Sequence, residues 1–567
     1  MISPSLDAAE NTFPWDPFAP REDPLGPRRG EWWIAAFLIL GVAARVVRYA
    51  LCFPLWSDEA FLAATHLSRG YLDMFRPLEY HQVCPILFLW AQHACVDLFG
   101  FRENSLRLFP LLCSLAGLAV FWRMAGRLLR GTALVLGVGI FAVGYPGIRY
   151  AAEAKPYSCD LLVSLVLMAL FVEWWRQPQR LRWLWALVAA APLAVGFSYP
   201  AVFVGGGISV AVAWVLWRAR LHRGWPVWIV WNLALCGSFL LVYQTCIKAQ
   251  NSELGNMRDY WHASFPPLDS AVKFTAWVVS THSGDMLAHP FGGPRGGSTL
   301  TFICCAAAVV MLCRRRQLTL LVFAAGTLAL NFAAAAVHRF PYAGHVRMAL
   351  YLAPLVCLLA GLGLTEILAW GRSRWLDHSA IQNPKSKIQN LKSLLLNPLL
   401  LVLLCLAAIP LGSMVRDYLH PGKTPEDIEA RKFARDFWPT MERDGEVVCL
   451  KTDRDLSFLP NLDFAPEVFQ WGYSSLYLCN ERIYSPRHAR REPPDLSRVS
   501  AARPLRCVYY RCLEPGRGDD RKGLARWLDS MRQRYEQVGH RVYLIRHNVD
   551  KELKVVAHVE VYEFVKK

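Results

Sequence analysis

The fold of this chain is decided by one stretch, residues 106–176, which reads LRLFPLLCSLAGLAVFWRMAGRLLRGTALVLGVGIFAVGYPGIRYAAEAKPYSCDLLVSLVLMALFVEWWR. It holds three apolar blocks, the first two joined by a basic turn at 123–130 and the last two by a polar segment at 150–156. An apolar block of about twenty residues is long enough to cross a bilayer as a helix. The stretch therefore predicts three successive membrane-spanning helices whose two connections differ in charge.

The same pattern repeats along most of the 567 residues, of which 54% are hydrophobic and 19% charged. Soluble domains carry about 25% charged residues, so the composition disfavours a soluble enzyme and excludes a disordered, collagen-like or disulfide-scaffold protein. The sequence predicts a predominantly α-helical, polytopic membrane bundle. Its apolar blocks lie at 32–52, 82–100, 104–129, 132–149, 157–175, 181–198, 200–217, 226–247, 298–313, 318–337, 345–370 and 393–413.

The formal net charge of +17 is concentrated in the turns between these blocks. Cytoplasmic loops of membrane proteins carry an excess of Lys and Arg, so the charge indicates topology rather than nucleic-acid binding. We therefore predict no nucleic-acid partner. The basic turns lie at 123–130, 176–182, 218–223, 314–316 and 372–387.

Twelve full crossings contradict this charge pattern, because every basic turn after the second block would face outward. Removing block 82–100 from the spans makes all of these turns cytoplasmic. That block also contains Gln92, His93 and Asp97, which are polar for a lipid-facing helix. We predict about eleven spans, with 82–100 re-entrant or interfacial on the external side. The segments 53–103, 150–156, 248–297, 338–344 and 414–567 then lie outside.

Three regions follow from this pattern. Residues 1–30, rich in Pro and acidic residues, predict a disordered cytoplasmic leader rather than a secretory signal. Residues 31–413 form the predicted transmembrane catalytic domain. Residues 414–567 predict a small extracytoplasmic α/β domain in which helices and strands alternate. Its helical stretches are 424–441 and 523–538, and its strand-like runs are 446–450, 506–510, 541–545 and 556–564.

The sixteen Cys residues show no CxxC pair and no His/Cys ligand spacing, so we predict no zinc site. A disulfide in the C-terminal region requires that this domain be exported, and free thiols are favoured there. The cysteines in question are Cys449, Cys479, Cys507 and Cys512.

The first candidate for chemistry is the pair Asp58–Glu59 in WSDEAF, directly after the first span. Two adjacent carboxylates at a membrane surface are costly unless they are paired, face water or hold a metal. One could act as a general base toward an acceptor hydroxyl or amine. The alternative is an ordinary helix start, in which the pair complements the N-terminal dipole and Ser57 is the cap.

A second candidate is GIRYAAEAKPYSCD, residues 147–160, at the predicted external mouth between two spans. It places Arg149, Glu153, Lys155 and Tyr157 within one short segment. The alternative is that these side chains anchor helix ends, with Glu153 and Lys155 as a structural ion pair.

A third candidate is HRFPYAGHVRM, residues 338–348, where His345 and Arg347 precede a span. Positive charge outside runs against the inside bias, and an anionic headgroup explains it because Arg binds phosphate in a bidentate manner. Bulk anionic lipid is the alternative ligand. Weaker candidates elsewhere are His81 with Gln82, Lys273, His282 and Asp285.

Taken in order, these segments carry a resemblance. The chain is similar to the lipid-sugar-dependent membrane glycosyltransferases of the GT-C superfamily in four successive segments. These are the carboxylate pair, HQVCPILFLWAQHACVDLFGF, RENSLRLFPLL and RYAAEAKPYSCDLL. The nearest group is the bacterial protein mannosyltransferase and aminoarabinose transferase-like families. The resemblance covers roughly residues 30–370. The chain departs from it at His81-Gln82-Val83-Cys84-Pro85, where relatives often have His-Pro-Pro.

The resemblance implies a polyprenyl-phosphate sugar as donor, an unidentified glycan, lipid or protein acceptor, and inversion at the anomeric carbon. It implies that Asp58 is the general base with Glu59 beside it. It also implies that a basic turn binds the phosphate leaving group, which here is Arg347 with His345.

The remaining substrate-binding residues lie on the same predicted face. The resemblance places Glu153, Lys155 and Tyr157 in the external site, and we add His81 and Arg149. A divalent cation, Mg²⁺ or Mn²⁺, is optional. Its candidate ligands are Asp58, Glu59 and Glu153.

Two other functions are compatible with many spans and basic turns. A solute transporter or lipid flippase with an external accessory domain predicts inverted repeats and polar residues deep in mid-span, and the sequence shows no such repeat. A non-catalytic scaffold predicts no dependence on Asp58. In each case we expect a multi-pass protein of the inner (plasma) membrane, with its C-terminal domain outside.

Overall fold

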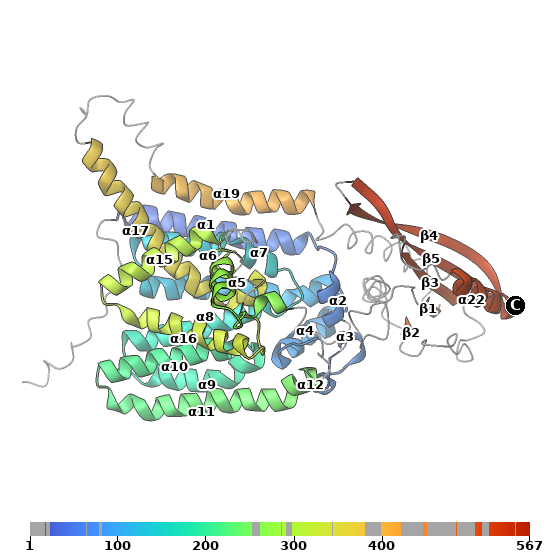
Figure 1. Ribbon diagram of the computed structural model, residues 1–567, viewed down its shortest axis with the longest axis horizontal. Helices are drawn as coiled ribbons and strands as arrows, with labels where there is room; N and C mark the ends of the chain where they lie inside the picture. Colours follow the sequence, from blue (N-terminus) through green and yellow to red (C-terminus); the bar gives the residue numbers. More distant parts are fainter. Residues whose placement is uncertain are drawn as a thin grey trace, which may run out of the picture.

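A computed structural model describes residues 18, 23–63, 65–78, 82–251, 261–284, 286–290, 298–342, 344–379, 398–420, 446–450, 483–484, 505–512, 521–549 and 552–567. Long helices form a bundle, and a β-sheet lies beyond one of its ends (Figure 1). The sequence prediction of a helical bundle with a small C-terminal α/β domain is confirmed.

The long helices run roughly side by side (Figure 1). They are α1 (Gly26–Ala50), α5 (Glu103–Leu128), α6 (Gly131–Val143), α8 (Tyr157–Arg176), α9 (Arg182–Phe197), α10 (Ala201–Arg218), α11 (Trp225–Val242), α15 (Thr299–Arg314), α16 (Leu318–Ala336), α17 (Ala353–Ser379) and α19 (Pro398–Leu419). In the described residues, 8 helical segments are long and apolar enough to cross a membrane, and shorter apolar helices accompany them. The protein is thus a multi-span membrane protein, and the number of eleven spans stays a prediction.

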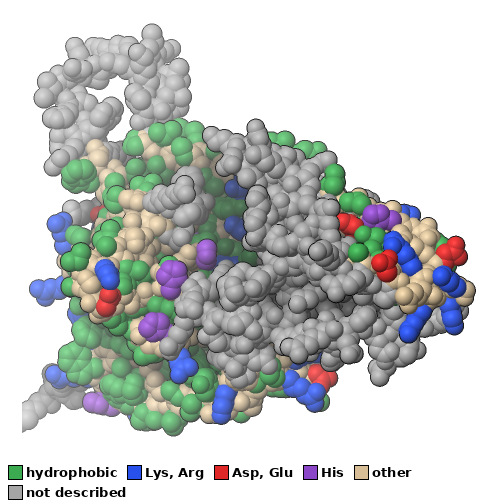
Figure 2. Space-filling view, turned by 45° about the vertical axis from the view of Figure 1, so that its right-hand side comes forward, with side chains coloured by type: hydrophobic (Ala, Val, Ile, Leu, Met, Phe, Trp, Pro, Cys, Tyr) green, Lys and Arg blue, Asp and Glu red, His purple; other side chains and the backbone are tan. Residues whose placement is uncertain are grey.

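Many apolar side chains lie on the bundle surface that is coloured in Figure 2. Trp32, Ile39, Leu193 and Leu241 are each more than half exposed, although they lie on long apolar helices. Exposed apolar surface on this scale marks an interaction with a partner or a membrane. Because it belongs to helices of spanning length, it is the surface that faces lipid.

Close helix crossings inside the bundle depend on glycine. A Cβ on Gly361 of α17 would lie 2.5 Å from the backbone N of Gly137 on α6, so these two backbones touch. A Cβ on Gly363 would collide with the carbonyl oxygen of Cys304 on α15 in the same way. Small residues at such crossings are how membrane helices gain van der Waals contact.

Short helices occupy the end of the bundle that faces the sheet (Figure 1). Among them are α2 (Ser57–Ala63), α3 (Thr65–Ser68), η2 (Leu72–Phe75), α4 (Ile86–Phe99) and α12 (Lys248–Asn251). The 14 residues of α4 span about 21 Å. The hydrocarbon core of a bilayer is about 30 Å thick, but α6 with its 13 residues is no longer than α4, so that block 82–100 does not cross stays a prediction.

Ion pairs at the opposite ends of the long helices support the predicted topology. Arg127 near the end of α5 pairs with Glu173 near the end of α8, at 3.0 Å. Arg315, after α15, pairs with Glu366 of α17 at 2.8 Å. Four of the predicted cytoplasmic turns, 123–130, 176–182, 314–316 and 372–387, thus lie at helix ends that meet in these pairs, which agrees with their prediction on one side of the membrane.

Two predicted segments differ from the structure. The predicted leader ends earlier, because α1 begins at Gly26 and Phe18 forms a parallel bridge with Leu129. The predicted span 132–149 is broken: α6 ends at Val143, and a separate short helix, α7 (Tyr145–Tyr150), follows.

The C-terminal sheet has the strand order β2-β1-β3-β5-β4. Its strands are β1 (Glu446–Leu450), β2 (Ile483–Tyr484), β3 (Leu505–Cys512), β4 (Tyr535–Val549) and β5 (Glu552–Lys566). β1 is parallel to β2 and β3, whereas β5 runs antiparallel to β3 and β4. Helix α22 (Arg521–Arg534) ends before the predicted residue 538, because residues 535–538 already belong to β4. The predicted helix at 424–441 lies outside the described residues, as do the side chains of the four C-terminal cysteines.

Candidate active site

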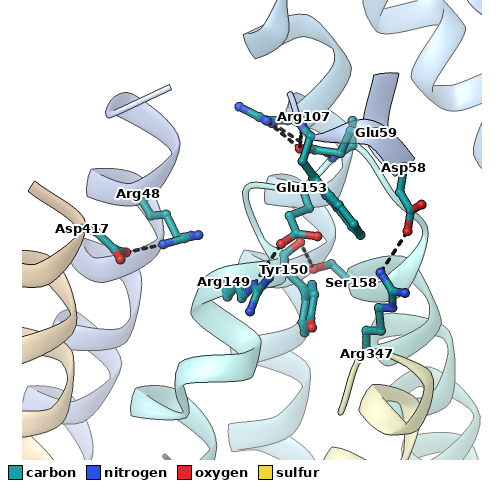
Figure 3. Close-up of polar contacts among 12 residues, drawn as sticks. Arg48, Asp58, Glu59, Arg107, Arg149, Tyr150, Glu153, Ser158, Arg347 and Asp417 are labelled. Atoms are coloured by element: carbon teal, nitrogen blue, oxygen red, sulfur yellow. Dashed lines mark hydrogen bonds and ion pairs between the residues drawn. The ribbon is translucent and has the colours of Figure 1, made fainter. Parts of the chain in front are cut away.

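Asp58 and Arg347 form an ion pair at the end of the bundle that carries α2 (Figure 3). Arg347 Nη1 donates to Asp58 Oδ2 at 2.9 Å. The Asp58 side chain is 29% exposed and that of Arg347 only 9%, so the carboxylate is accessible while the guanidinium is held inside. The pair brings the predicted general base and the predicted phosphate ligand into direct contact.

The turn before η7 (Val346–Leu352) fixes the position of Arg347. Gly344 has a φ of 91°, and a Cβ there would lie 1.9 Å from Ser264 Oγ, so the turn requires glycine. The Arg347 guanidinium then lies over the rings of Trp56 and Trp261, at 5.2 and 5.5 Å from their centroids. Two cation–π contacts therefore hold the charge beside Asp58.

Glu59 is fully buried and accepts four hydrogen bonds. Its Oε1 accepts from Arg107 Nε at 3.0 Å and from the backbone N of Ala154 at 2.6 Å. Its Oε2 accepts from Arg107 Nη2 at 2.8 Å and from the backbone N of Trp56 at 3.3 Å. The carboxylate thus joins α2, α5 and the 150–156 segment. These contacts favour a positioning role for Glu59 over a catalytic one.

The break between α6 and α7 brings Arg149 to the site. Pro146 stands in the first turn of α7, and Arg45 of α1 donates to the carbonyl oxygen of Ala142 at the end of α6, at 2.7 Å. A Cβ on Gly147 would lie 2.9 Å from Arg45 Nη2, so glycine leaves room for the arginine. Within the motif GYPGIRY, the predicted span therefore ends with α6, and the short helix α7 that follows carries Arg149.

The charged residues of the 147–160 segment have separate partners. Arg149 Nε pairs with Glu153 Oε1 at 3.1 Å, and Glu153 is 1% exposed (Figure 3). Lys155 Nζ donates to Gln82 Oε1 at 2.6 Å. Gln82 thus enters the site at the position where the sequence departs from its relatives.

Burial dominates the electrostatics of Lys155. It lowers the pKa of this amine, while the Asp58 carboxylate acts in the opposite direction and Arg347 in the same direction. Asp58, Lys155 and Arg347 therefore belong to one electrostatic unit with two cations and one anion. Such a unit is suited to bind an additional negative charge.

The aromatic and histidine candidates have different positions. The Tyr157 ring packs edge-to-face on Tyr150, with centroids 5.2 Å apart. Burial raises the pKa of Tyr150, so its hydroxyl stays neutral. His345 is exposed, and its ring lies 5.7 Å from that of Trp261. His81 lies outside the described residues.

The weaker candidates have local partners. Lys273 pairs with Asp269 at 2.6 Å in an exposed ion pair. His282 Nδ1 lies 2.7 Å from the carbonyl oxygen of Val278. Asp285 lies outside the described residues. None of these contacts reaches the Asp58–Arg347 pair.

Sequence reasoning missed three buried arginines, Arg45, Arg48 and Arg107. Arg107 holds Glu59, and Arg48 of α1 pairs with Asp417 of α19 (Figure 3). Arg45 donates to Ser114 Oγ and to two backbone carbonyl oxygens. The sequence contained the evidence for them: Arg107 lies within RENSLRLFPLL, and Arg45 and Arg48 lie within the first apolar block, 32–52. An arginine inside an apolar block requires an internal partner.

The carboxylates do not converge on a cation site. Asp58, Glu59 and Glu153 each face a different arginine, and the described part of the chain has no group of three His, Cys, Asp or Glu side chains placed to hold a metal ion. The Mg²⁺ or Mn²⁺ considered from the sequence does not fit this donor set. We therefore derive no step through a metal.

Part of the chain matches a known protein family. Residues 83–243 match the family model of dolichyl-phosphate-mannose-protein mannosyltransferases. No curated protein sequence matches the chain. The family match begins one residue after Gln82 and includes Arg107 and the whole 147–160 segment.

Two solved structures have the same fold. ArnT from Cupriavidus metallidurans in the apo state aligns with a TM-score of 0.50 and 13% identity, covering 94% of this chain and 98% of that one. ArnT from Cupriavidus metallidurans bound to undecaprenyl phosphate aligns with a TM-score of 0.51 and 15% identity over the same shares. The chain has an ArnT-like fold. Together with the family match, this fold supports a GT-C-type membrane glycosyltransferase.

Proposed function

We propose that the protein transfers a sugar from a polyprenyl-phosphate donor to an acceptor on the external face of the membrane. The observation that carries this proposal is the direct contact between an accessible carboxylate, Asp58, and a buried arginine, Arg347. The mannosyltransferase family match and the ArnT structure bound to undecaprenyl phosphate support the same donor class.

The transfer is a displacement at the anomeric carbon. An acceptor hydroxyl or amine attacks this carbon, the bond from the carbon to the phosphate oxygen breaks, and its electron pair leaves with the polyprenyl phosphate. The acceptor proton moves to the Asp58 carboxylate, which acts as general base. Arg347 and Lys155 stabilise the negative charge that develops on the leaving phosphate. Attack from the face opposite the phosphate inverts the anomeric configuration.

The ion pair that Asp58 and Arg347 form in the absence of donor links donor binding to activation of the base. While Arg347 is bound to Asp58, the carboxylate oxygen Oδ2 accepts a hydrogen bond from the guanidinium and is not available to an acceptor. The donor phosphate is a diester with one negative charge and two terminal oxygens, so it can form a bidentate contact and compete for the same guanidinium. Donor binding therefore releases Asp58 toward the acceptor, so the base becomes active only when the leaving group is in place.

The acceptor approaches from the end of the bundle that carries α2 and the C-terminal sheet (Figure 1). The basic turns belong to the opposite end, which supports placement of the site on the external face of the inner membrane. A flippase or transporter is less well supported, because its polar residues should lie deep in mid-span.

Transfer from radiolabelled polyprenyl-phosphate sugars to membrane acceptors tests the proposal, using the full chain in nanodiscs. Replacing Asp58 by Asn is expected to lower the turnover rate about 10²- to 10⁴-fold, the usual contribution of a general base. The matched control is Asp269→Asn, which removes an exposed carboxylate from the same side of the protein.

Binding of polyprenyl phosphate without a sugar separates the roles of the two residues. Asp58→Asn should bind at least as tightly as the wild type, because Arg347 no longer has a carboxylate partner. Unchanged transfer in Asp58→Asn would refute the assignment of the base.

A further inference from the structure

The backbone of Cys84 is held by the side-chain amide of Gln250, a residue 166 positions away. Cys84 N donates to Gln250 Oε1 at 3.2 Å, and Gln250 Nε2 donates to the carbonyl oxygen of Cys84 at 3.1 Å. Both residues are buried. Two residues that exchange two hydrogen bonds in this way are paired as in antiparallel strands. This contact, the Gln250–Cys84 clamp, gives a strand-like partner to residues 82–85, which belong to no helix or strand.

The local sequence presents Cys84 to this amide. Pro85 directly precedes α4, and a proline favours extended backbone at the residue before it. In extended backbone the N–H and C=O of one residue point to the same side, so a single amide can bind both. Tyr199, between α9 and α10, donates its hydroxyl to the same carbonyl oxygen at 2.9 Å. Gln250 and Tyr199 thus occupy both lone pairs of this carbonyl, which fixes the backbone at Cys84.

Gln82, two residues before Cys84, binds the amine of Lys155. Lys155 Nζ donates to Gln82 Oε1 at 2.6 Å, and Lys155 is 7% exposed. An ammonium group has three hydrogens, so one bond to Gln82 leaves two for a phosphate. Because an amide is neutral, Gln82 orients the amine without removing its positive charge. A carboxylate at the same position would orient the amine and neutralise it.

We propose that Gln250 is a positioning residue of the donor site: by holding the backbone of Cys84, it places Gln82 so that the Lys155 amine is directed toward the donor phosphate. The inference rests on the proposed function and deepens it, because it adds the residue that sets the geometry of one phosphate-binding cation. The other cation, Arg347, lies over Trp261. Gln250 and Trp261 belong to the same predicted external segment, 248–297, so both cations depend on this segment.

Reductive methylation of Lys155 with formaldehyde and a borane reductant tests the placement of the amine without any donor. The rate is read by mass spectrometry on the full chain in nanodiscs. Gln250→Met keeps the length of the side chain but has no amide. Its Lys155 should be methylated about tenfold faster than in the wild type, since a charge-assisted hydrogen bond that holds the amine is lost. Gln82→Met should show the same increase, and the double variant no more than either.

Binding of polyprenyl phosphate to the same variants connects the Gln250–Cys84 clamp to the donor. Gln250→Met and Gln82→Met should each weaken binding about tenfold. The double variant should bind no more weakly than Gln82→Met alone, because both changes act on one amine. Gln82→Glu keeps the shape of the side chain but neutralises Lys155. It should therefore weaken binding while the methylation of Lys155 becomes slower, a combination that general loosening of the fold would not produce.

Two further variants complete the design. Gln92→Met is the matched control, because it removes the amide of another buried glutamine, which donates to the carbonyl oxygen of Leu106 at 2.7 Å. It should leave the methylation rate of Lys155 unchanged. Tyr199→Phe is the milder variant if Gln250→Met does not fold, since it removes only the hydroxyl from the Cys84 carbonyl. It should raise the methylation rate about threefold, as expected for one neutral hydrogen bond.

The outcomes distinguish this inference from the proposed function. A wild-type methylation rate in Gln250→Met overturns the inference, as do losses of donor binding that add up in the double variant. A Gln92→Met protein that behaves like Gln250→Met overturns it too. If methylation responds as expected but even the wild type does not bind polyprenyl phosphate, the proposed function fails and the placement of Lys155 by Gln250 stands.

Discussion

Arg347 contacts Asp58 at 2.9 Å across 289 residues of sequence, and this contact defines the candidate site. It joins the helix that follows the first span to the turn before one of the last. The guanidinium is placed by Gly344 and by two tryptophans, whereas the carboxylate remains accessible. An arginine that already holds an anion in the donor-free state is prepared for a second anion.

We expect Arg347 to be needed for donor binding in a way that lysine cannot replace. Lysine retains the charge but cannot form a bidentate contact with phosphate. Arg347→Lys should weaken binding of polyprenyl phosphate about tenfold or more, since a hydrogen bond to a charged group contributes about 1.5–3 kcal/mol. Equilibrium binding in nanodiscs checks this, with the exposed Arg339→Lys as matched control. Equal losses in both variants would assign the effect to general surface charge.

The Glu59–Arg107 pair should determine stability more than chemistry. Glu59→Gln leaves a fully buried arginine without its counter-charge, which typically costs about 3–5 kcal/mol. Thermal unfolding of the purified protein measures this loss. Glu366→Gln is the control, because it removes the carboxylate of a partly exposed pair with Arg315. A stable Glu59→Gln protein without activity would instead favour the catalytic role predicted from the sequence.

Donor affinity should depend on pH through Lys155. Burial lowers the pKa of its amine, so the charge is lost below the usual lysine range. Phosphate binds the protonated form, hence affinity should fall as pH rises from about 7.5 to about 10, a window above the second phosphate pKa of about 6. The stability of the donor-free protein should depend on pH in the opposite direction. A group whose pKa is lowered on folding binds fewer protons in the folded state, so stability rises with pH across the same window.

Lys155→Arg is the diagnostic variant for this pH dependence, because arginine stays charged throughout the range. Its affinity for polyprenyl phosphate should not change between the two pH values. A wild-type affinity that is equally flat would show that Lys155 does not contact the phosphate.

The crossing of α6 and α17 should tolerate no side chain at Gly361. A Cβ there meets the backbone of Gly137 at 2.5 Å, and backbone cannot move aside as a flexible side chain can. Gly361→Val is expected to destabilise the bundle by at least about 1–3 kcal/mol. Gly371→Val on the same helix is the control, since nothing lies within 4 Å of its Cβ. The yield of folded, monodisperse protein measures the difference.

Hydropathy and charge were enough to predict the bundle, because a helix in lipid must satisfy its own backbone hydrogen bonds and be apolar over a fixed length. The same reasoning predicted that block 82–100 differs from the spanning helices. Hydropathy did not predict the break at Gly144 between α6 and α7, because this break depends on Arg45, a residue of another helix.

Pairing within the site was less predictable. Asp58, Glu153 and Arg347 could be predicted as candidates, because charged side chains at the external end of a membrane helix are costly unless they are paired or bind a ligand. Which arginine binds which carboxylate depends on contacts between distant parts of the chain, such as Glu59 with Arg107 and Ala154.

The pair Arg48–Asp417 has a consequence for how the protein is made. It joins the first long helix to the last across 369 residues, and both side chains are 5% exposed. During synthesis, the arginine of α1 enters the membrane long before its carboxylate leaves the ribosome. Until α19 inserts, α1 carries an unneutralised cation at the membrane boundary. Insertion of the last helix therefore neutralises a cation of the first one.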